Sequence, residues 1–94
     1  MKNKNTKERT LIFDQVGIEA FAIHLKQLRH ELGVTQNQLA YEAGLSLSQI
    51  ARIETARTNP TLSTIFAIAR ALDIPLASIF NFSLPENKIT DKKK

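Results

Sequence analysis

Few residues of this 94-residue chain have side chains that could carry out chemistry of their own. The sequence has no cysteine, which excludes disulfides, thiol nucleophiles and cysteine-ligated zinc. Its two histidines, His24 and His30, are separated by a step that puts them on different faces of a helix. A Ser/His/Asp set, a glycine-rich phosphate loop and a carboxylate cluster are also missing. We therefore expect no enzyme, no metal site and no cofactor.

A second pattern depends on side-chain size instead of reactivity. Gln36, Ala40, Gly44 and Ile50 stand at relative positions one, five, nine and fifteen. Two short helices that cross over a tight turn need a small residue where they meet and a positive φ at the bend. Ala40 and Gly44 meet these needs, and Ile50 is a branched apolar residue that can face back onto the first helix. The spacing predicts a helix-turn-helix.

The helices that must position this motif are visible in the hydrophobic pattern. Apolar residues recur at steps of three and four from Ile18 to Leu32, which predicts an amphipathic helix ending at Gly33. Thr35 is suited to cap a two-turn helix over residues 36–43. Glycine and proline are expected at the joints between segments. These joints are Gly17, Gly33, Gly44, Pro60, Pro75 and Pro85.

Three further helices are predicted in the second half of the chain. Ser46 is suited to cap a helix through about residue 54, in which Ile50 and Ile53 share the inward stripe. After a polar loop at 55–61, an apolar face runs from Leu62 to Leu72, and Pro75 is suited to open a short fifth helix. No long segment alternates with period two, although residues 10–13 could form an extended arm. The expected fold class is all-α.

The segment TQNQLAYEAGLSLSQIARIETARTNPTLSTIFAIARALDIPLASIF resembles the phage-repressor and Cro type of helix-turn-helix domain, often called Xre-like. The resemblance runs from about Leu25 to Phe80 and includes the motifs TQ-x-x-LA, N-P-T and A-I-A-R-A-L-D-I-P-L. It implies a five-helix repressor-like domain that binds double-stranded DNA and regulates transcription, as a repressor. The helix at about 46–54 would be the recognition helix in the major groove.

The resemblance also implies roles for individual residues. The implied DNA contacts are Gln36 on a phosphate, Ser46, Leu47, Ser48, Gln49 and Arg52 at base edges, and Thr55, Arg57 and Asn59 along the sugar-phosphate backbone. Helix N-termini and hydroxyls suit phosphate oxygens, and an arginine can bind guanine with two hydrogen bonds. Arg29 and Glu54 match a pair that joins the first and third helices in the family, so both are expected to be structural.

Each of these residues also has a simpler explanation. Ser46 is first of all a helix cap, Gln36 can be an exposed helical residue, and Arg52 can be a solvated surface charge. Two positions depart from the family pattern. Leu47 replaces a polar or basic residue, so it can read a thymine methyl or contribute little. Ala56 stands where glycine is common, which weakens the assignment of Arg57.

The net charge of +4 is carried by the ends of the chain. Residues 1–10 hold four basic side chains against one acidic, and residues 83–94 hold four against two, whereas residues 11–82 hold five against six. We expect a flexible basic arm at 1–10, a domain at 11–82 and a flexible tail at 83–94. Basic tails are often only solubilising, so this charge permits a polyanion partner without demonstrating one.

Few cations in the domain predict modest DNA affinity per monomer, which dimerisation would increase. The family resemblance suggests a homodimer through the fourth and fifth helices, where Phe66, Ile68, Phe80, Phe82 and Leu84 are the apolar candidates. Residues 11–13 could instead cover that surface. The alternative function is an antitoxin or adaptor that uses the same fold to bind a protein partner. No membrane segment or secretory signal is found, so a cytoplasmic protein is expected.

Overall fold

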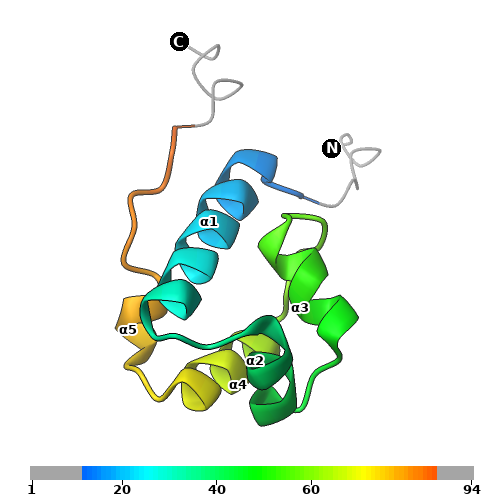
Figure 1. The fold of residues 1–94 in the computed structure, drawn as a ribbon. Helices are drawn as coiled ribbons and strands as arrows, with labels where there is room; N and C mark the ends of the chain where they lie inside the picture. Colours follow the sequence, from blue (N-terminus) through cyan, green and yellow to red (C-terminus); the bar gives the residue numbers. More distant parts are fainter. Residues whose placement is uncertain (1–11, 87–94) are drawn as a thin grey trace, which may run out of the picture.

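The computed structural model describes residues 12–86, which form five helices and contain no strand (Figure 1). The helices are α1 (Gln15–Glu31), α2 (Gln36–Ala43), α3 (Leu47–Glu54), α4 (Leu62–Leu72) and α5 (Leu76–Ile79). The predicted all-α fold with five helices is confirmed. The expected arm at 1–10, and residues 87–94 of the expected tail, lie outside the described residues.

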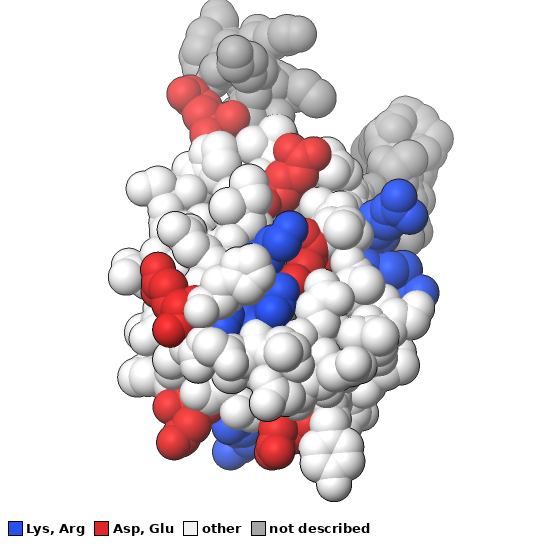
Figure 2. Space-filling model, viewed as in Figure 1, with Lys and Arg blue, Asp and Glu red and all other residues white. Residues whose placement is uncertain are grey.

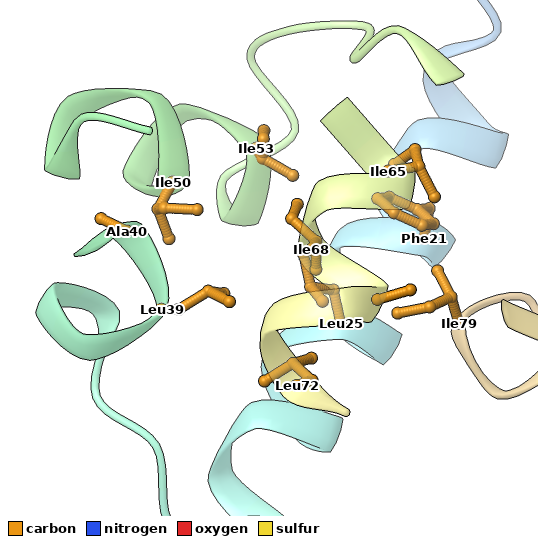
Figure 3. Close-up of a cluster of buried hydrophobic side chains, with 11 residues drawn as sticks. Phe21, Leu25, Leu39, Ala40, Ile50, Ile53, Ile65, Ile68, Leu72 and Ile79 are labelled. Carbon is orange, nitrogen blue, oxygen red and sulfur yellow. The ribbon is translucent and has the colours of Figure 1, made fainter. Parts of the chain in front are cut away.

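One fully buried side chain from each helix forms the centre of the core (Figure 3). These are Leu25 of α1, Leu39 of α2, Ile50 of α3, Ile68 of α4 and Ile79 of α5. Burying each such side chain stabilises the fold by about 1.5–3 kcal/mol before conformational entropy is counted. Because every helix supplies a residue, the short α3 is held against α1 and α2 by the same core that holds α4 and α5.

Helix α1 begins three residues earlier than the hydrophobic pattern predicts. The carboxylate of Asp14 caps it, with Oδ1 accepting a hydrogen bond from the backbone N of Gly17 at 2.9 Å. Gly17 was expected at a joint but lies inside the first turn of α1. A Cβ at this position would lie 2.9 Å from Oδ2 of Asp14, so the missing side chain leaves room for the cap.

The turn between α2 and α3 is shaped by one glycine and two capping boxes. Gly44 ends α2 with φ +72°, in the left-handed region where glycine has no steric penalty. Thr35 and Ser46 cap α2 and α3 as predicted. In each box the side chain of the third helical residue, Gln38 or Gln49, accepts a hydrogen bond from the backbone N of the cap residue, which the sequence interpretation did not anticipate.

A buried ion pair ties α1 to α3. The guanidinium of Arg29 donates from Nε to Glu54 Oε2 at 2.6 Å and from Nη2 to Glu54 Oε1 at 2.9 Å. A third donor of Arg29, Nη1, binds the carbonyl of Val34 in the α1–α2 turn at 2.8 Å. Glu54 Oε1 also accepts from Nε2 of Gln36, the first residue of α2, at 2.9 Å. One carboxylate therefore holds side chains from two other helices.

The environment of Glu54 favours the charged carboxylate. Burial alone raises its pKa, but hydrogen bonds from Arg29 and Gln36 and the charges of Arg29 and Lys26 act in the opposite direction and lower the pKa overall. The hydrogen bond to Glu54 likewise raises the pKa of Arg29. Both partners therefore stay charged at neutral pH.

Replacing Gly44 by valine is expected to lower the free energy of unfolding by about 1–3 kcal/mol. A Cβ there meets no atom within 4 Å, so the cost is backbone strain in the left-handed region and not a clash. Gly44→Asn is the matched control, because asparagine tolerates positive φ. Thermal unfolding by circular dichroism should place the asparagine variant between wild type and the valine variant, and equal melting of both variants would contradict the explanation.

Replacing Glu54 by glutamine should cost about 3–5 kcal/mol of unfolding free energy, because Arg29 is left as a buried charge without its counter-ion. The exposed Glu42→Gln is the control, with an expected change below about 0.5 kcal/mol. Urea unfolding at neutral pH measures both. Similar values for the two variants would show that the ion pair does not hold the helices together.

The lowered pKa of Glu54 also predicts how wild-type stability depends on pH. The ionised Glu54 contributes its full stabilisation at pH values above 4.5, the ordinary pKa of the group. This stabilisation is lost as the pH falls through the lowered pKa of Glu54 in the folded state. Melting temperature should therefore decline on acidification below about pH 4.5. This portion of the decline should be absent in Glu54→Gln and present in Glu42→Gln.

Candidate nucleic-acid interface

Helix α3 divides its side chains between the core and solvent. Ile50 and Ile53 are buried, and their spacing fixes which side of the helix faces inward. The predicted base-reading residues are all exposed: Ser46, Leu47, Ser48, Gln49 and Arg52. The structure therefore places this set together on the outward side of α3 and at its N-terminal end. The geometry can present hydrogen-bonding groups to a ligand that approaches α3 from outside.

Several of these polar groups are already ordered by local hydrogen bonds. Ser46 Oγ accepts from the backbone N of Gln49 at 3.0 Å, and Gln49 Oε1 accepts from the backbone N of Ser46 at 2.9 Å. The Oε1 of Gln49 is thus engaged in the cap, and its Nε2 makes no hydrogen bond within the described residues. Arg52 Nη1 donates to Ser48 Oγ at 3.2 Å, one helical turn earlier. These bonds direct the side chains along the outer face of α3.

Gln36 has a contact that the sequence interpretation missed. Its Nε2 donates to Glu54, so the side chain is half-buried and fixed in orientation. An amide nitrogen carries two hydrogens, and only one is used by this bond. Gln36 therefore belongs to the structural network and still has a donor left for a phosphate. The two residues are eighteen positions apart, so no local pattern signals the bond.

Gln36 also lines an open hollow on one side of α3. The hollow measures about 610 Å³, and Arg29 and His30 of α1, Gln36 and Asn37 of α2, and Leu47 of α3 are among the residues that line it. Leu47 is 45% exposed. The start of α2 thus lies beside the start of α3, as expected if both contact one ligand.

A smaller hollow of about 190 Å³ lies on the other side of α3. It is lined by Gln49 and Arg52 from the helix, by Asn59 in the following loop and by Thr61 and Thr64 at the start of α4. The predicted loop residue Asn59 is therefore next to the outward side of α3. The exposed side of α3 lies between two hollows, each bordered by the N-terminal end of another helix.

The α3–α4 loop keeps a left-handed turn without glycine. Ala56 has φ +59°, and the backbone N of Arg57 donates to the carbonyl of Arg52 at 2.9 Å, which closes the turn. Thr55 Oγ1 donates to the carbonyl of Ala51 at 2.8 Å, so its hydroxyl oxygen retains only acceptor capacity. Arg57 is exposed and follows this turn directly. The departure at Ala56 therefore leaves the turn intact.

The two histidines do not meet. His24 Nε2 hydrogen-bonds the carbonyl oxygen of Ser78 at 2.7 Å and its ring lies 5.3 Å from that of Phe82, linking α1 to the end of α5. His30 is exposed beside Arg29. Among residues 12–86, no three His, Asp or Glu side chains are grouped closely enough to hold a metal ion. No helix in that same range is both long and apolar enough to cross a bilayer.

Basic and acidic side chains both occur on the face that contains α3. Figure 2 shows Lys and Arg side chains in the strip between α1 and α3, with acidic groups directly beside them, and further basic side chains beside α3. Arg29–Glu54 is the one ion pair found among the described residues. The remaining cations on this part of the chain are thus not neutralised by direct pairing.

Comparison with known proteins assigns this arrangement to a family. The helix-turn-helix family HTH_3 matches residues 25–79. The immunity repressor protein of Bacillus phage phi105 is 49% identical over 55 residues, which cover 58% of this chain and 38% of that protein. The transcriptional repressor RghR of Bacillus subtilis is 42% identical over 59 residues, covering 62% and 44%. The chain thus spans less than half the length of these two relatives.

Solved structures agree with this assignment. The restriction-modification controller protein C.AhdI of Aeromonas hydrophila has a TM-score of 0.65 at 33% identity, covering 67% of this chain and 96% of that one. The controller protein C.Esp1396I, solved as a tetramer with its natural 35 base-pair operator, has a TM-score of 0.64 at 28% identity, with 67% and 83% covered. The motif, the five helices and these matches show that the chain belongs to the helix-turn-helix family HTH_3.

Proposed function

We propose that this protein binds double-stranded DNA sequence-specifically and regulates transcription as a repressor, with α3 in the major groove. The observation that carries the proposal is the exposed side of α3 between two hollows, one beside the start of α2 and one beside the start of α4. A helix in the major groove has a phosphate strand on each side, and helix N-termini bind phosphates. The geometry fits that ligand on both sides of α3.

The comparisons support the same function. The matched relatives are named as a phage immunity repressor and a transcriptional repressor, and C.Esp1396I was solved on its operator. Because the chain covers only part of the two named relatives, their regulatory activity enters here as part of the proposal. A DNA ligand places this protein inside the cell, and we propose the cytoplasm as its location.

Each predicted contact residue receives a role in this proposal. Ser48, Gln49 and Arg52 read base edges, and Leu47 contacts a thymine methyl or excludes water. Gln36 binds a phosphate with its second amide hydrogen. Ser46, which caps α3, offers its hydroxyl to a base edge. Thr55, Arg57 and Asn59, in the loop that follows α3, contact the sugar-phosphate backbone of the other DNA strand.

We further propose that two copies associate through an apolar hollow of about 330 Å³. It lies between the N-terminal part of α1, the start of α4 and the segment after α5. Leu62 and Leu84 on its rim are 65% and 71% exposed, and Phe80 is 45% exposed. Exposed apolar residues gathered at one place mark an interaction site more often than scattered ones do. A two-fold dimer would present two recognition helices to one operator.

Two parts of the sequence interpretation change at this surface. Ile68 was a candidate for the dimer contact, but its side chain is fully buried in the core and cannot reach a second molecule. Phe66 is 40% exposed, but it lines a different hollow at the α4–α5 turn. Ile12 and Phe13 are not among the residues that line the apolar hollow, and Leu11 lies outside the described residues.

The alternative is a protein-binding antitoxin or adaptor. The feature that favours it is Leu47, an exposed apolar side chain at the start of the recognition helix. A protein partner would cover this residue and would not require the polar residues at the start of α2. Binding to duplex DNA separates the two functions.

Arg52→Ala should cost about 1–3 kcal/mol of binding free energy for the preferred duplex and relax selection at one base pair. Gln36→Ala should weaken binding to all duplexes by a similar factor, because a phosphate contact carries no sequence information. Selection from a random duplex library followed by fluorescence anisotropy measures both effects. Equal losses on all sequences for both variants would refute the assigned roles, and no binding of the wild type to any duplex would favour the protein-binding alternative.

Leu62→Asp should shift the protein from dimer to monomer, because it places a charge at the rim of the apolar hollow. Ser63→Asp is the matched control, since its neighbouring side chain is exposed and does not line the hollow. Sedimentation equilibrium measures the mass of both variants. If the Leu62→Asp variant has the mass of a dimer, as the Ser63→Asp control should, this surface is not the dimer interface.

A further inference from the structure

Helix α1 borders the proposed DNA interface along its second half. Arg29 and His30 line the hollow that also contains Gln36 and Leu47, so the end of α1 lies next to the starts of α2 and α3. Lys26 precedes these residues by one helical turn, at the spacing that puts residues on the same side of a helix. Its side chain is exposed, and its positive charge contributes to the lowered pKa of Glu54.

The positive charge of Lys26 is not used inside the domain. Both oxygens of Glu54 are engaged, Oε2 by Arg29 and Oε1 by Arg29 and Gln36. Lys26 makes no salt bridge to any group in residues 12–86. An exposed lysine that makes no ion pair with a carboxylate of the domain is free to bind an external anion.

The other cations show why this charge matters. Five basic residues lie between residues 12 and 86: Lys26, Arg29, Arg52, Arg57 and Arg70. Arg29 is buried against Glu54, and Arg70 lines the hollow at the α4–α5 turn together with Asp73. Lys26, Arg52 and Arg57 are the remaining cations, and all three are exposed and make no ion pair within residues 12–86. Figure 2 shows basic groups together with acidic ones in the strip between α1 and α3.

We propose that Lys26 binds the sugar-phosphate backbone of DNA beside the phosphate contacted by Gln36, which makes α1 a third element of the interface. This inference rests on the proposed function. It extends the contact beyond the helix-turn-helix itself, and it assigns α1 to affinity and not to base selection. The acidic Glu19, in the N-terminal half of α1, lines another hollow together with Glu54 and Thr55, so the proposal assigns the contact to the C-terminal half of α1.

The test is the salt dependence of DNA binding. Fluorescence anisotropy is recorded with a labelled duplex selected by the wild type from a random library, and with a mixed-sequence duplex of equal length, from 50 to 200 mM KCl. Each phosphate contact contributes about 0.9 to the slope of log affinity against log salt. Lys26→Gln should reduce the slope by about this amount per bound chain on both duplexes, and the affinity ratio between the duplexes should not change.

Two variants keep the result interpretable. Arg70→Gln removes the same charge from an exposed site away from α3 and should retain the wild-type slope. Lys26→Arg should restore the slope lost in Lys26→Gln. If Lys26→Gln and Arg70→Gln give the same slope, this inference is wrong while the proposed function stands. If the wild type binds neither duplex, the proposed function and this inference both fail.

Discussion

The carboxylate of Glu54 is the point on which the arrangement of the first three helices depends. It sits at the last residue of α3 and receives hydrogen bonds from Arg29 of α1 and Gln36 of α2. A buried ion pair gains little net stability over well-packed apolar residues, because both ions lose their hydration. Its directional bonds do more for geometry, since a bidentate guanidinium and carboxylate accept few relative orientations. The pair therefore fixes how α1, α2 and α3 lie relative to one another.

This geometry decides what α3 can offer to a ligand. An isolated helix of eight residues is unstable in water, so α3 exists because Ile50 and Ile53 are packed in the core and Ser46 closes its first turn. The same two isoleucines leave Ser48, Gln49 and Arg52 outside. Side chains on the outer face are then held by bonds to each other and to the cap. Ordering before binding reduces the entropy lost when a ligand is bound.

The distribution of charge suits a partner that is bound by several weak contacts. The described residues contain few cations, and one of them, Arg29, is paired with Glu54. A single domain of this kind would release few counter-ions from DNA, so its affinity would be modest at physiological salt. Two linked copies would bind DNA with a higher overall affinity, although neither copy makes more contacts than it does alone. The exposed apolar rim around Leu62 and Leu84 provides the surface on which such pairing would depend.

Much of the fold could be predicted because its signals are local. The periodicity of apolar residues gave the helices, Thr35 and Ser46 marked two helix starts, and the sizes of Ala40 and Gly44 indicated the turn. These effects act between residues that are close in the sequence, so the sequence pattern alone can predict them. Asp14 was missed as a cap because the apolar repeat begins only later, and Gly17 looked like a joint for the same reason.

The tertiary structure alone decided which distant side chains meet. It joined Gln36 to Glu54, buried Ile68 while leaving Leu62 exposed, and brought the end of α1 to the hollow that holds the start of α2. A helical pattern gives the apolar side of α4 but not which of its edges the other helices cover. Contacts between helices depend on how all five pack around one core, and that packing is a property of the whole chain.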